Sequence, residues 1–274
     1  MKKIIPFFLA AFTMAACSSG KTSAPVDNSD ASKYLVLYYS QTGATKAVAE
    51  EMARLLDADI EAVQARVPYD GDFDQTVARG QTERSRGEMP ELLPLKSDIS
   101  KYECIFLGYP IWFGTYALPV ATLVKQMDFA GKKVVPFCTF GSGGLTESAA
   151  QLKAALPKAD IRDGYGVRTA RIPAMPAEVS AFLKKNGFLE GEVPVLPEFG
   201  PQHPVTEEEM QIFNAACGDY QYPLGTPSTV SNRRTADGTD YKFIVPGVQG
   251  ASVIYVIHPS ADGGKPEFTM VERN

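Results

Sequence analysis

The amino-acid sequence predicts an α/β protein with a doubly wound parallel sheet of strand order 2-1-3-4-5. A small α+β domain, with one helix and an antiparallel four-stranded meander, is predicted to follow it. The first prediction depends on strand-like apolar runs that alternate with amphipathic helical segments, three of the runs being apolar almost throughout. The second depends on a change after residue 187, where one helical segment precedes several strand-like runs separated by turn signals.

The elements of the first domain, residues 33–187, can be assigned individually. The expected strands are residues 34–39, 60–65, 104–108 and 133–138. The expected helices are residues 44–56, 117–126, 145–156 and 176–186. Short joints between strand and helix imply parallel strands with right-handed crossovers.

Residues 66–99 form a longer connection that is rich in charge and proline, with a helix expected around residues 72–88. Long connections of this kind are often functional, although a solvated surface flap is the more common case.

Composition limits the classes of function. The chain has 274 residues, 45% hydrophobic and 22% charged, which suits two globular domains. Its net charge of -5 gives no basic surface for nucleic acid.

The N-terminus has the pattern of a targeting signal. Lys2 and Lys3 precede the apolar stretch "IIPFFLAAFTM", so residues 1–16 are expected to be a cleaved signal peptide. The sequence "MAAC" resembles the lipobox of bacterial lipoproteins, which implies lipidation of Cys17; a plain secretory signal with an incidental cysteine is the alternative. Residues 17–32 hold almost only small and polar residues and are expected to be a flexible tether. We therefore expect a protein anchored in the bacterial cell envelope, on the periplasmic face or the outer surface.

Three cysteines remain beyond Cys17, namely Cys104, Cys138 and Cys217, and an odd number implies no disulfide framework. Cys104 and Cys138 lie in apolar runs, so buried, unreactive thiols are favoured over a redox pair between neighbouring strands.

The loop "SQTGAT", residues 40–45, follows the first expected strand and begins the first expected helix. Backbone N–H groups at a helix N-terminus, next to the hydroxyls of Ser40, Thr42 and Thr45, favour a bound phosphate. Gly43 permits close approach of the backbone. An ordinary helix cap is the competing interpretation. A Walker loop and a dinucleotide fingerprint are excluded because their glycine spacing and lysine are missing.

Two further loops follow later strands. "YPIWFGTYALP", residues 109–119, places Trp112 with Phe113 and Tyr116 in a turn, where exposed aromatic side chains favour a flat partner. "TFGSGGLTES", residues 139–148, offers glycine backbone amides to the edge of a planar ring. The first and third strands flank the switch point of such a sheet, so the loops should converge on one ligand.

On these three motifs, residues 33–187 resemble the flavodoxin-like family that binds FMN. The matching segments are "SQTGAT" for the phosphate loop, "YPIWFGTYALPV" for the family's tryptophan loop, and "TFGSGG" for its third loop. Phe113 stands where a second tryptophan is usual, and Phe140 where a small or polar residue is common. The residues that the resemblance implies for FMN binding are Ser40, Gln41, Thr42, Gly43, Ala44, Thr45, Pro110, Ile111, Trp112, Phe113, Gly114, Thr139, Phe140, Gly141, Gly143 and Gly144.

Residues 188–274 begin with a proline-rich linker, followed by a helix over residues 205–218 with Thr206 as its cap. Three glutamates in its first turn suit the helix dipole better than a metal site. Expected strands follow near residues 228–235, 241–246, 251–258 and 267–272. The segment "TADGTDYKFIV" faintly resembles the hairpin of the cystatin-like fold, which implies a fold but no inhibitory residues.

Other chemistry is not indicated. His203 and His258 have no ligand-spaced companions and are expected in the linker and at a strand end. Ser142 lies in "GSGG", which is not a nucleophile elbow. No residue is assigned as a catalytic acid or base, or as a metal ligand.

These observations predict a lipid-anchored FMN protein that transfers electrons to or from an unidentified redox partner. The alternatives are an FMN-dependent NAD(P)H:quinone-type oxidoreductase and a cofactor-free scaffold that displays the C-terminal domain to a partner protein.

Overall fold

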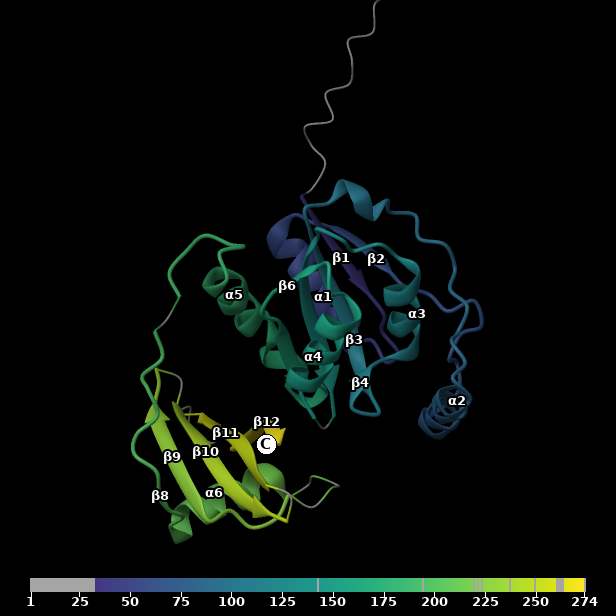
Figure 1. Ribbon diagram of the computed structural model, residues 1–274. Helices are drawn as coiled ribbons and strands as arrows, with labels where there is room; N and C mark the ends of the chain where they lie inside the picture. Colours follow the sequence, from purple (N-terminus) through teal and green to yellow (C-terminus); the bar gives the residue numbers. More distant parts are fainter. Residues whose placement is uncertain are drawn as a thin grey trace, which may run out of the picture. The chain divides into compact units, whose positions relative to one another are not determined.

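A parallel sheet covered by helices on both faces forms the first part of the chain in the computed structural model (Figure 1). The structure describes residues 33–273 except residues 142, 194, 219, 221, 223, 237, 249 and 260–263. The predicted signal peptide, tether and lipidated Cys17 lie outside the described residues. Ser142, which the sequence excluded as a catalytic nucleophile, also lies outside them. A single compact unit, Ser32–Asn274, contains everything described below.

The parallel sheet has the predicted strand order. Its strands are β1 (Tyr34–Tyr38), β2 (Asp59–Ala62), β3 (Cys104–Trp112), β4 (Thr115–Tyr116), β5 (Lys133–Phe140), β6 (Asp160–Ile161) and β7 (Tyr165–Arg168). The main path is β2-β1-β3-β5-β6, and β4 pairs with β3 in a hairpin. Both β6 and β7 pair with β5 in parallel, β6 with residues 133–134 and β7 with residues 137–140. The fifth position is thus an interrupted strand, and the order 2-1-3-4-5 is confirmed.

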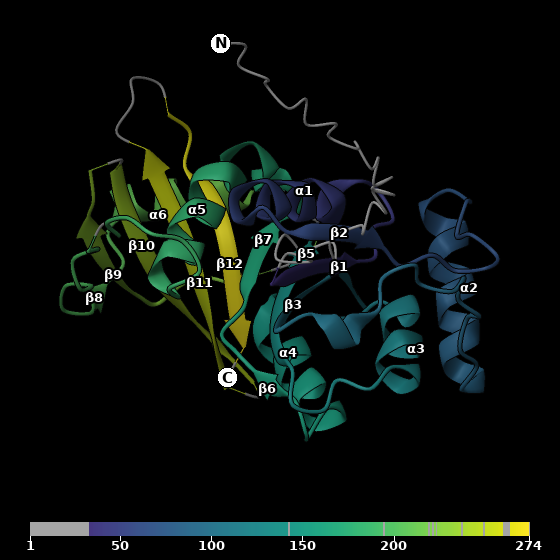
Figure 2. The ribbon, with the colours of Figure 1, turned by 90° about the horizontal axis from the view of Figure 1, so that it is seen from above.

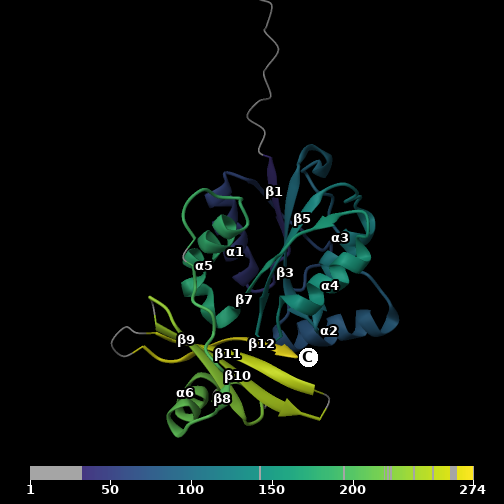
Figure 3. The ribbon, with the colours of Figure 1, turned by 60° about the vertical axis from the view of Figure 1, so that its left-hand side comes forward.

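Helices cover both faces, as Figures 2 and 3 show. They are α1 (Ala44–Leu56), α3 (Leu118–Gln126), α4 (Leu145–Ala155) and α5 (Met175–Lys185), after a 3-10 segment at Thr169–Ala174. Alternate strand residues enter separate cores. Leu35 and Leu37 pack in the cluster that includes side chains of α3 and α4, whereas Val36 packs with those of α1 and α5. Continuously apolar strands follow because both faces are buried.

The long connection between β2 and β3 contains helix α2 (Phe73–Arg86), as predicted. Asp72 and Gln75 form a reciprocal capping box at its start. Gly87 ends the helix in the left-handed region, with φ of 66°. A 3-10 turn at Ile99–Lys101 leads into β3.

The buried cysteines do not form a pair. Cys104 is opposite Lys133 in the register of β3 and β5, whereas Cys138 is opposite Tyr109, five positions further along. At about 3.3 Å per residue this offset exceeds the Cα separation of a disulfide. The two side chains also enter different cores, on opposite faces of the sheet. Burial raises the pKa of the Cys104 thiol to about 12 and also raises that of Cys138. Buried, unreactive thiols are therefore the correct interpretation, and a redox pair is not.

The C-terminal region, residues 203–273, is one helix against an antiparallel sheet. Its elements are β8 (His203–Pro204), α6 (Glu207–Cys217), β9 (Thr229–Arg234), β10 (Gly238–Gly247), β11 (Gly250–Pro259) and β12 (Glu267–Arg273). The strand order is β12-β11-β10-β9-β8, so a short strand, β8, joins the predicted four-stranded meander. Phe213 of α6 packs edge-on against Phe243 of β10, with ring centroids 5.1 Å apart. The resemblance to the cystatin-like fold stays a prediction.

The glutamate that closes the first turn of α6 has a structural role. Thr206 and Glu209 form a capping box, and the Thr206 hydroxyl also donates to Glu209 Oε2 at 2.9 Å. His203 Nε2 lies 3.0 Å from Glu209 Oε1, so this histidine belongs to strand β8 and the capping network, where the sequence predicted a linker residue. His258 lies in β11, near its end.

Two properties of the described residues concern membranes and metals. Within the described ranges, no helix combines the length and apolar character needed to cross a bilayer. In the same ranges, no three His, Cys, Asp or Glu side chains gather as a metal site would require.

We predict that Glu209→Gln lowers the free energy of unfolding by about 1–2 kcal/mol at pH 7. The reason is that the capping box of Thr206 and Glu209 loses hydrogen bonds to a charged acceptor. Burial alone raises the pKa of Glu209, but hydrogen bonds from Thr206 and His203 outweigh it and lower the pKa below its usual 4.5. Because the pKa of Glu209 is lower in the folded than in the unfolded protein, its carboxylate stabilises the fold at pH values above the unfolded pKa. This stabilisation is lost as the pH falls through the folded pKa.

The difference between wild type and Glu209→Gln should therefore shrink below about pH 4.5, the usual carboxyl range. Urea unfolding followed by far-UV circular dichroism at several pH values measures it. A difference that does not depend on pH would contradict this role of the carboxylate.

Candidate functional site

Three loops meet at the carboxyl ends of neighbouring strands β1, β3 and β5. The register places Tyr38 opposite Gly108, and Pro110 opposite Thr139, so the ends of the three strands are adjacent. Ligands of open α/β sheets bind at this edge, where the strand order reverses. The predicted site residues all lie in these loops or in the residues that flank them.

The first loop connects β1 to α1 through an open turn. Thr42 and Gly43 are exposed, and Gly43 adopts the left-handed φ of 92°, which favours glycine. Ser40 Oγ accepts hydrogen bonds from the amides of Gly43 at 3.2 Å and Lys46 at 3.1 Å. Ser40 therefore organises the N-terminus of α1 from a position three residues before its N-cap, Gly43. The turn remains open on its outer side, because a Cβ on Gly43 would have no heavy atom within 4 Å.

Thr45 joins the first loop to the third. It is 1% exposed, and its Oγ1 lies 2.8 Å from Thr139 Oγ1 at the end of β5. The hydroxyl that the sequence placed beside a phosphate is thus paired inside the protein. Buried hydroxyl groups nearly always have a hydrogen-bond partner, and here each is the partner of the other. The backbone at Thr45, at the positive end of α1, remains the group suited to an anion.

The second loop is a tight hairpin between β3 and β4. Ile111 pairs with Tyr116 and Trp112 with Thr115, which leaves a two-residue turn of Phe113 and Gly114. Both have positive φ, 53° and 81°, as in a type I′ turn. Positive φ is an outlier for a bulky residue such as phenylalanine. Local contacts of the turn must therefore hold it in place.

Helix α2 supplies those contacts. Arg84 Nη1 donates to the carbonyl of Phe113 at 3.3 Å, and its guanidinium carbon lies 5.7 Å from the centre of that ring. Gly80 is buried, and a Cβ there would lie 3.2 Å from the Phe113 ring and 3.8 Å from Trp112. The helix of the long connection therefore packs on the aromatic loop. Residues 66–99 thus contact the aromatic loop of the candidate site through α2.

Trp112 is half-buried between two tyrosines. Its ring lies edge-on to Tyr39, with centroids 5.7 Å apart, and to Tyr69, with centroids 5.0 Å apart. Edge-to-face pairs at these distances are favourable beyond the area they bury. Trp112 is thus partly a core residue and partly available at the surface of the site.

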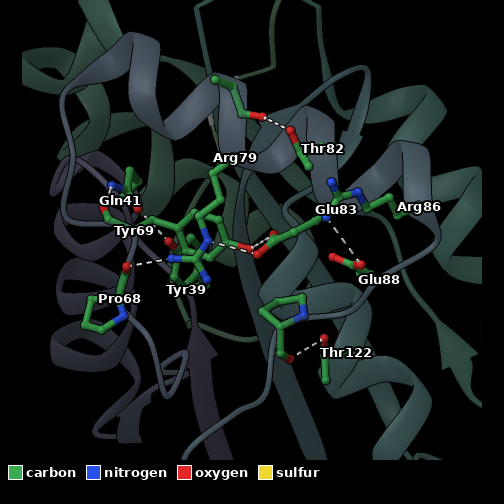
Figure 4. Close-up of polar contacts among 12 residues, drawn as sticks. Tyr39, Gln41, Pro68, Tyr69, Arg79, Thr82, Glu83, Arg86, Glu88 and Thr122 are labelled. Atoms are coloured by element: carbon green, nitrogen blue, oxygen red, sulfur yellow. Dashed lines mark hydrogen bonds and ion pairs between the residues drawn. The ribbon is translucent and has the colours of Figure 1, made fainter.

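A polar network holds Tyr69 in this position (Figure 4). Arg79 stacks over the Tyr69 ring at 3.8 Å and donates from Nε to Glu83 at 2.9 Å. The Tyr69 hydroxyl donates to the same Glu83 carboxylate. Gln41 of the first loop donates to the carbonyl of Tyr69 and accepts from the Tyr39 hydroxyl at 2.5 Å. One network therefore connects the phosphate loop, the aromatic cluster and α2.

The tyrosines of this network remain protonated at neutral pH. Burial raises the pKa of Tyr39, and burial together with the hydrogen bond to Glu83 raises that of Tyr69. Both phenols therefore act as hydrogen-bond donors.

The third loop presents open backbone. Cβ atoms on Gly141 or Gly143 would have no heavy atom within 4 Å, so the loop can accept a ligand against its main chain. Phe140 is 3% exposed and packs in the core, so its backbone alone can face the site. Thr139 is likewise buried. Three of the sixteen predicted residues, Thr45, Thr139 and Phe140, therefore have side chains buried away from the site.

The structure adds residues that the motifs did not identify. Tyr39, Tyr69, Arg79 and Glu83 position the aromatic loop, and Arg168 at the end of β7 donates from Nε to the carbonyl of Gly141 at 3.1 Å. The charge and length of residues 66–99 were the available signal for α2. No local pattern identified Arg168, because its partner is 27 residues away.

Among the described residues, hollows are also found away from these loops. One of about 340 Å³ runs along β2, lined by residues such as Glu61 and Lys96. One of about 490 Å³ lies at the amino ends of the strands, beside Lys133 and Asp160. Ligands of this sheet architecture bind at the carboxyl ends, so the three loops remain the candidate site.

Comparison with known proteins identifies the family of the chain. Residues 33–173 match the flavodoxin family. A protein from Bacteroides uniformis that is classed as a flavoprotein is 27% identical, over 55% of this chain and 99% of that one, with a TM-score of 0.49. A flavoprotein from Lactobacillus acidophilus, solved in complex with FMN, is 24% identical over 53% of this chain and 99% of that one, with a TM-score of 0.45. A search among proteins of curated function found no match.

The match covers a little over half of the 274 residues, and the chain belongs to the flavodoxin family. The resemblance inferred from the three loops is thereby confirmed. FMN is accordingly the cofactor expected at the carboxyl edge of the sheet.

We predict that Gly80→Val displaces the aromatic loop, because a branched side chain cannot fit 3.2 Å from the Phe113 ring. The free energy of unfolding should fall by about 1–3 kcal/mol through overpacking, and Trp112 fluorescence should shift. Ala78→Val, at an exposed position of the same helix, is the matched control and should do neither. Equal spectra for the two variants would show that α2 does not position the loop.

Proposed function

We propose that this protein binds FMN noncovalently at the three loops and transfers electrons through it in the bacterial cell envelope, tethered by a lipidated Cys17. The observation that carries the proposal is the open main chain of Gly43, Gly141 and Gly143 at one edge of the sheet. Open backbone at a strand-to-helix turn suits a phosphate, and open backbone beside aromatic side chains suits a flat ring.

The first loop would hold the phosphate by hydrogen bonds and the helix dipole. Thr42 is exposed in this loop, and Lys46 in the first turn of α1 is exposed and ion-paired with Glu50 at 3.5 Å. Hydrogen bonds rather than ion pairs therefore carry the recognition.

The second and third loops would hold the isoalloxazine ring. Trp112 offers the exposed part of its ring, while Tyr39 and Tyr69 fix its orientation from the other side. FMN, when bound, supplies the one- or two-electron chemistry. An apolar, aromatic surface and the net charge of -5 both disfavour added negative charge on the ring, which lowers its reduction potential.

An FMN titration followed by quenching of flavin fluorescence tests the proposal, with riboflavin as the phosphate-free control. The chain from Ser18 includes the whole compact unit Ser32–Asn274 and is the sample to use. Tight FMN binding with much weaker riboflavin binding supports both halves of the site. A folded sample that binds neither flavin contradicts it and leaves the scaffold interpretation.

Two further measurements separate the finer claims. Stopped-flow oxidation of NADH and NADPH, with a quinone as acceptor, distinguishes a carrier from a reductase. Metabolic labelling with a fatty acid, compared between wild type and Cys17→Ser, tests the tether. Absence of label on the wild type would contradict lipidation.

We predict that Thr42→Asp abolishes measurable FMN binding, because it places a carboxylate against the phosphate. The same carboxylate is favourable at the N-terminus of α1, by about 0.3–1 kcal/mol, so the fold should not suffer. Thr42→Asn is the uncharged control and should retain most of the affinity. Riboflavin binding should be almost equal in all three proteins, and unchanged FMN affinity in Thr42→Asp would contradict the phosphate assignment.

We predict that Trp112→Ala weakens FMN binding by about 1–3 kcal/mol and raises the reduction potential of the bound flavin. Trp112→Phe should recover part of both effects. Potentiometric titration measures the second effect. A potential that does not move would show that Trp112 acts only through its packing on Tyr39 and Tyr69.

A further inference from the structure

The C-terminal region touches the third loop of the candidate site. A Cβ built on Gly144 would lie 3.7 Å from the carbonyl oxygen of Val271 and 3.9 Å from Met270 Cγ, which is ordinary van der Waals contact. Both residues belong to β12, the edge strand of the antiparallel sheet. The glycine loop therefore has open space on the side of Gly141 and Gly143 and a strand on the side of Gly144.

Arg168 connects the loop to this strand by two hydrogen bonds, both of which it donates. Its Nε donates to the carbonyl of Gly141 at 3.1 Å, and its Nη1 donates to the carbonyl of Phe268 at 2.8 Å. The guanidinium carbon also lies 4.1 Å from the centre of the Phe268 ring and 5.5 Å from that of Tyr220. A planar guanidinium is suited to bridging two fixed acceptors while stacking on aromatic rings.

β12 contains a β-bulge next to this contact. The register against β11 slips between Tyr255 and Val256, so Thr269 is an extra residue between Phe268 and Met270. Phe268 and Val271 both enter the core of the C-terminal region, and the bulge turns Met270 to the opposite face. Bulges of this kind redirect a side chain and bend the strand.

A second link holds the same strand without touching the loop. Arg171 is 9% exposed and forms ion pairs with Glu178 of α5 and with Glu267, the first residue of β12. The two arginines thus have separable roles. Arg171 connects β12 to α5, whereas Arg168 connects β12 to the glycine loop.

We propose that Arg168 is a positioning residue through which β12 of the C-terminal region holds Gly141, Gly143 and Gly144 of the glycine loop in the conformation that receives the flavin ring. The C-terminal region is then a structural part of the cofactor site rather than an independent module. The inference rests on the proposed FMN site but makes a separate statement, which can be tested without FMN.

The first measurement is amide hydrogen exchange of the ligand-free protein. Arg168→Met should speed exchange of the amides at 143–145 by about tenfold, because the loop loses its external support. Arg168→Lys should behave similarly, since an ammonium on a flexible stem does not bridge both carbonyls. Glu267→Gln loosens the Arg171 link alone and should leave these amides at the wild-type rate. Thermal unfolding of each variant confirms that it folds.

The second measurement is the dissociation constant of FMN and of riboflavin for the same proteins. Arg168→Met should raise the dissociation constants of both flavins by about tenfold. The ratio of the two constants should stay the same, because the phosphate loop is intact. Glu267→Gln should stay within about twofold of wild type.

The outcomes separate the two claims. Wild-type protein that binds no flavin contradicts the proposed function, and the exchange measurement then decides the role of Arg168 by itself. Unchanged exchange in Arg168→Met, or equal effects of Arg168→Met and Glu267→Gln, would overturn the proposal. Full recovery in Arg168→Lys would do so as well, because charge alone would then suffice.

Discussion

Burial of the central strands on both faces is the constraint on which the rest of the structure depends. β1, β3 and β5 lie between two apolar cores, so polar groups for a ligand can lie only where the strands end. The shared register of these strands brings their carboxyl ends to one edge. The hydroxyl pair of Thr45 and Thr139 then ties the first loop to the third at the bottom of the site. A site at this edge follows from the sheet itself.

Most of the fold could be predicted because its signals are local. The apolar runs and helical spacings placed β1, β2, β3, β5 and the helices that cover the sheet within a few residues of their observed bounds, but they gave no signal for β4, β6 or β7. Short elements were less predictable: β8 has two residues, and it forms because His203 pairs with Val230 of β9. Such a strand has no periodicity of its own, and its sequence therefore looked like linker.

The candidate site divides in the same way. The motif residues of the three loops were predictable, because glycine, hydroxyl and aromatic residues at strand ends have a direct physical meaning. The direction of individual side chains was not. Thr45 and Phe140 point into the protein, since each finds a better partner there, a hydroxyl in one case and the core in the other. Tyr69 and Arg168 act through long-range contacts that only the folded chain creates.

The two halves of the site consequently differ in what supports them. The phosphate loop is held by the N-terminus of α1 and the Ser40 hydroxyl, which are its immediate neighbours in sequence. The aromatic loop and the glycine loop are supported by elements outside the parallel sheet. Gly80 of α2 packs against the aromatic loop, and Arg168 connects β12 to the glycine loop. A local support keeps phosphate recognition independent of the rest of the chain. Under the proposed function, changes in α2 or in the C-terminal region would therefore alter the surroundings of the flavin ring and leave the contacts of the phosphate in place.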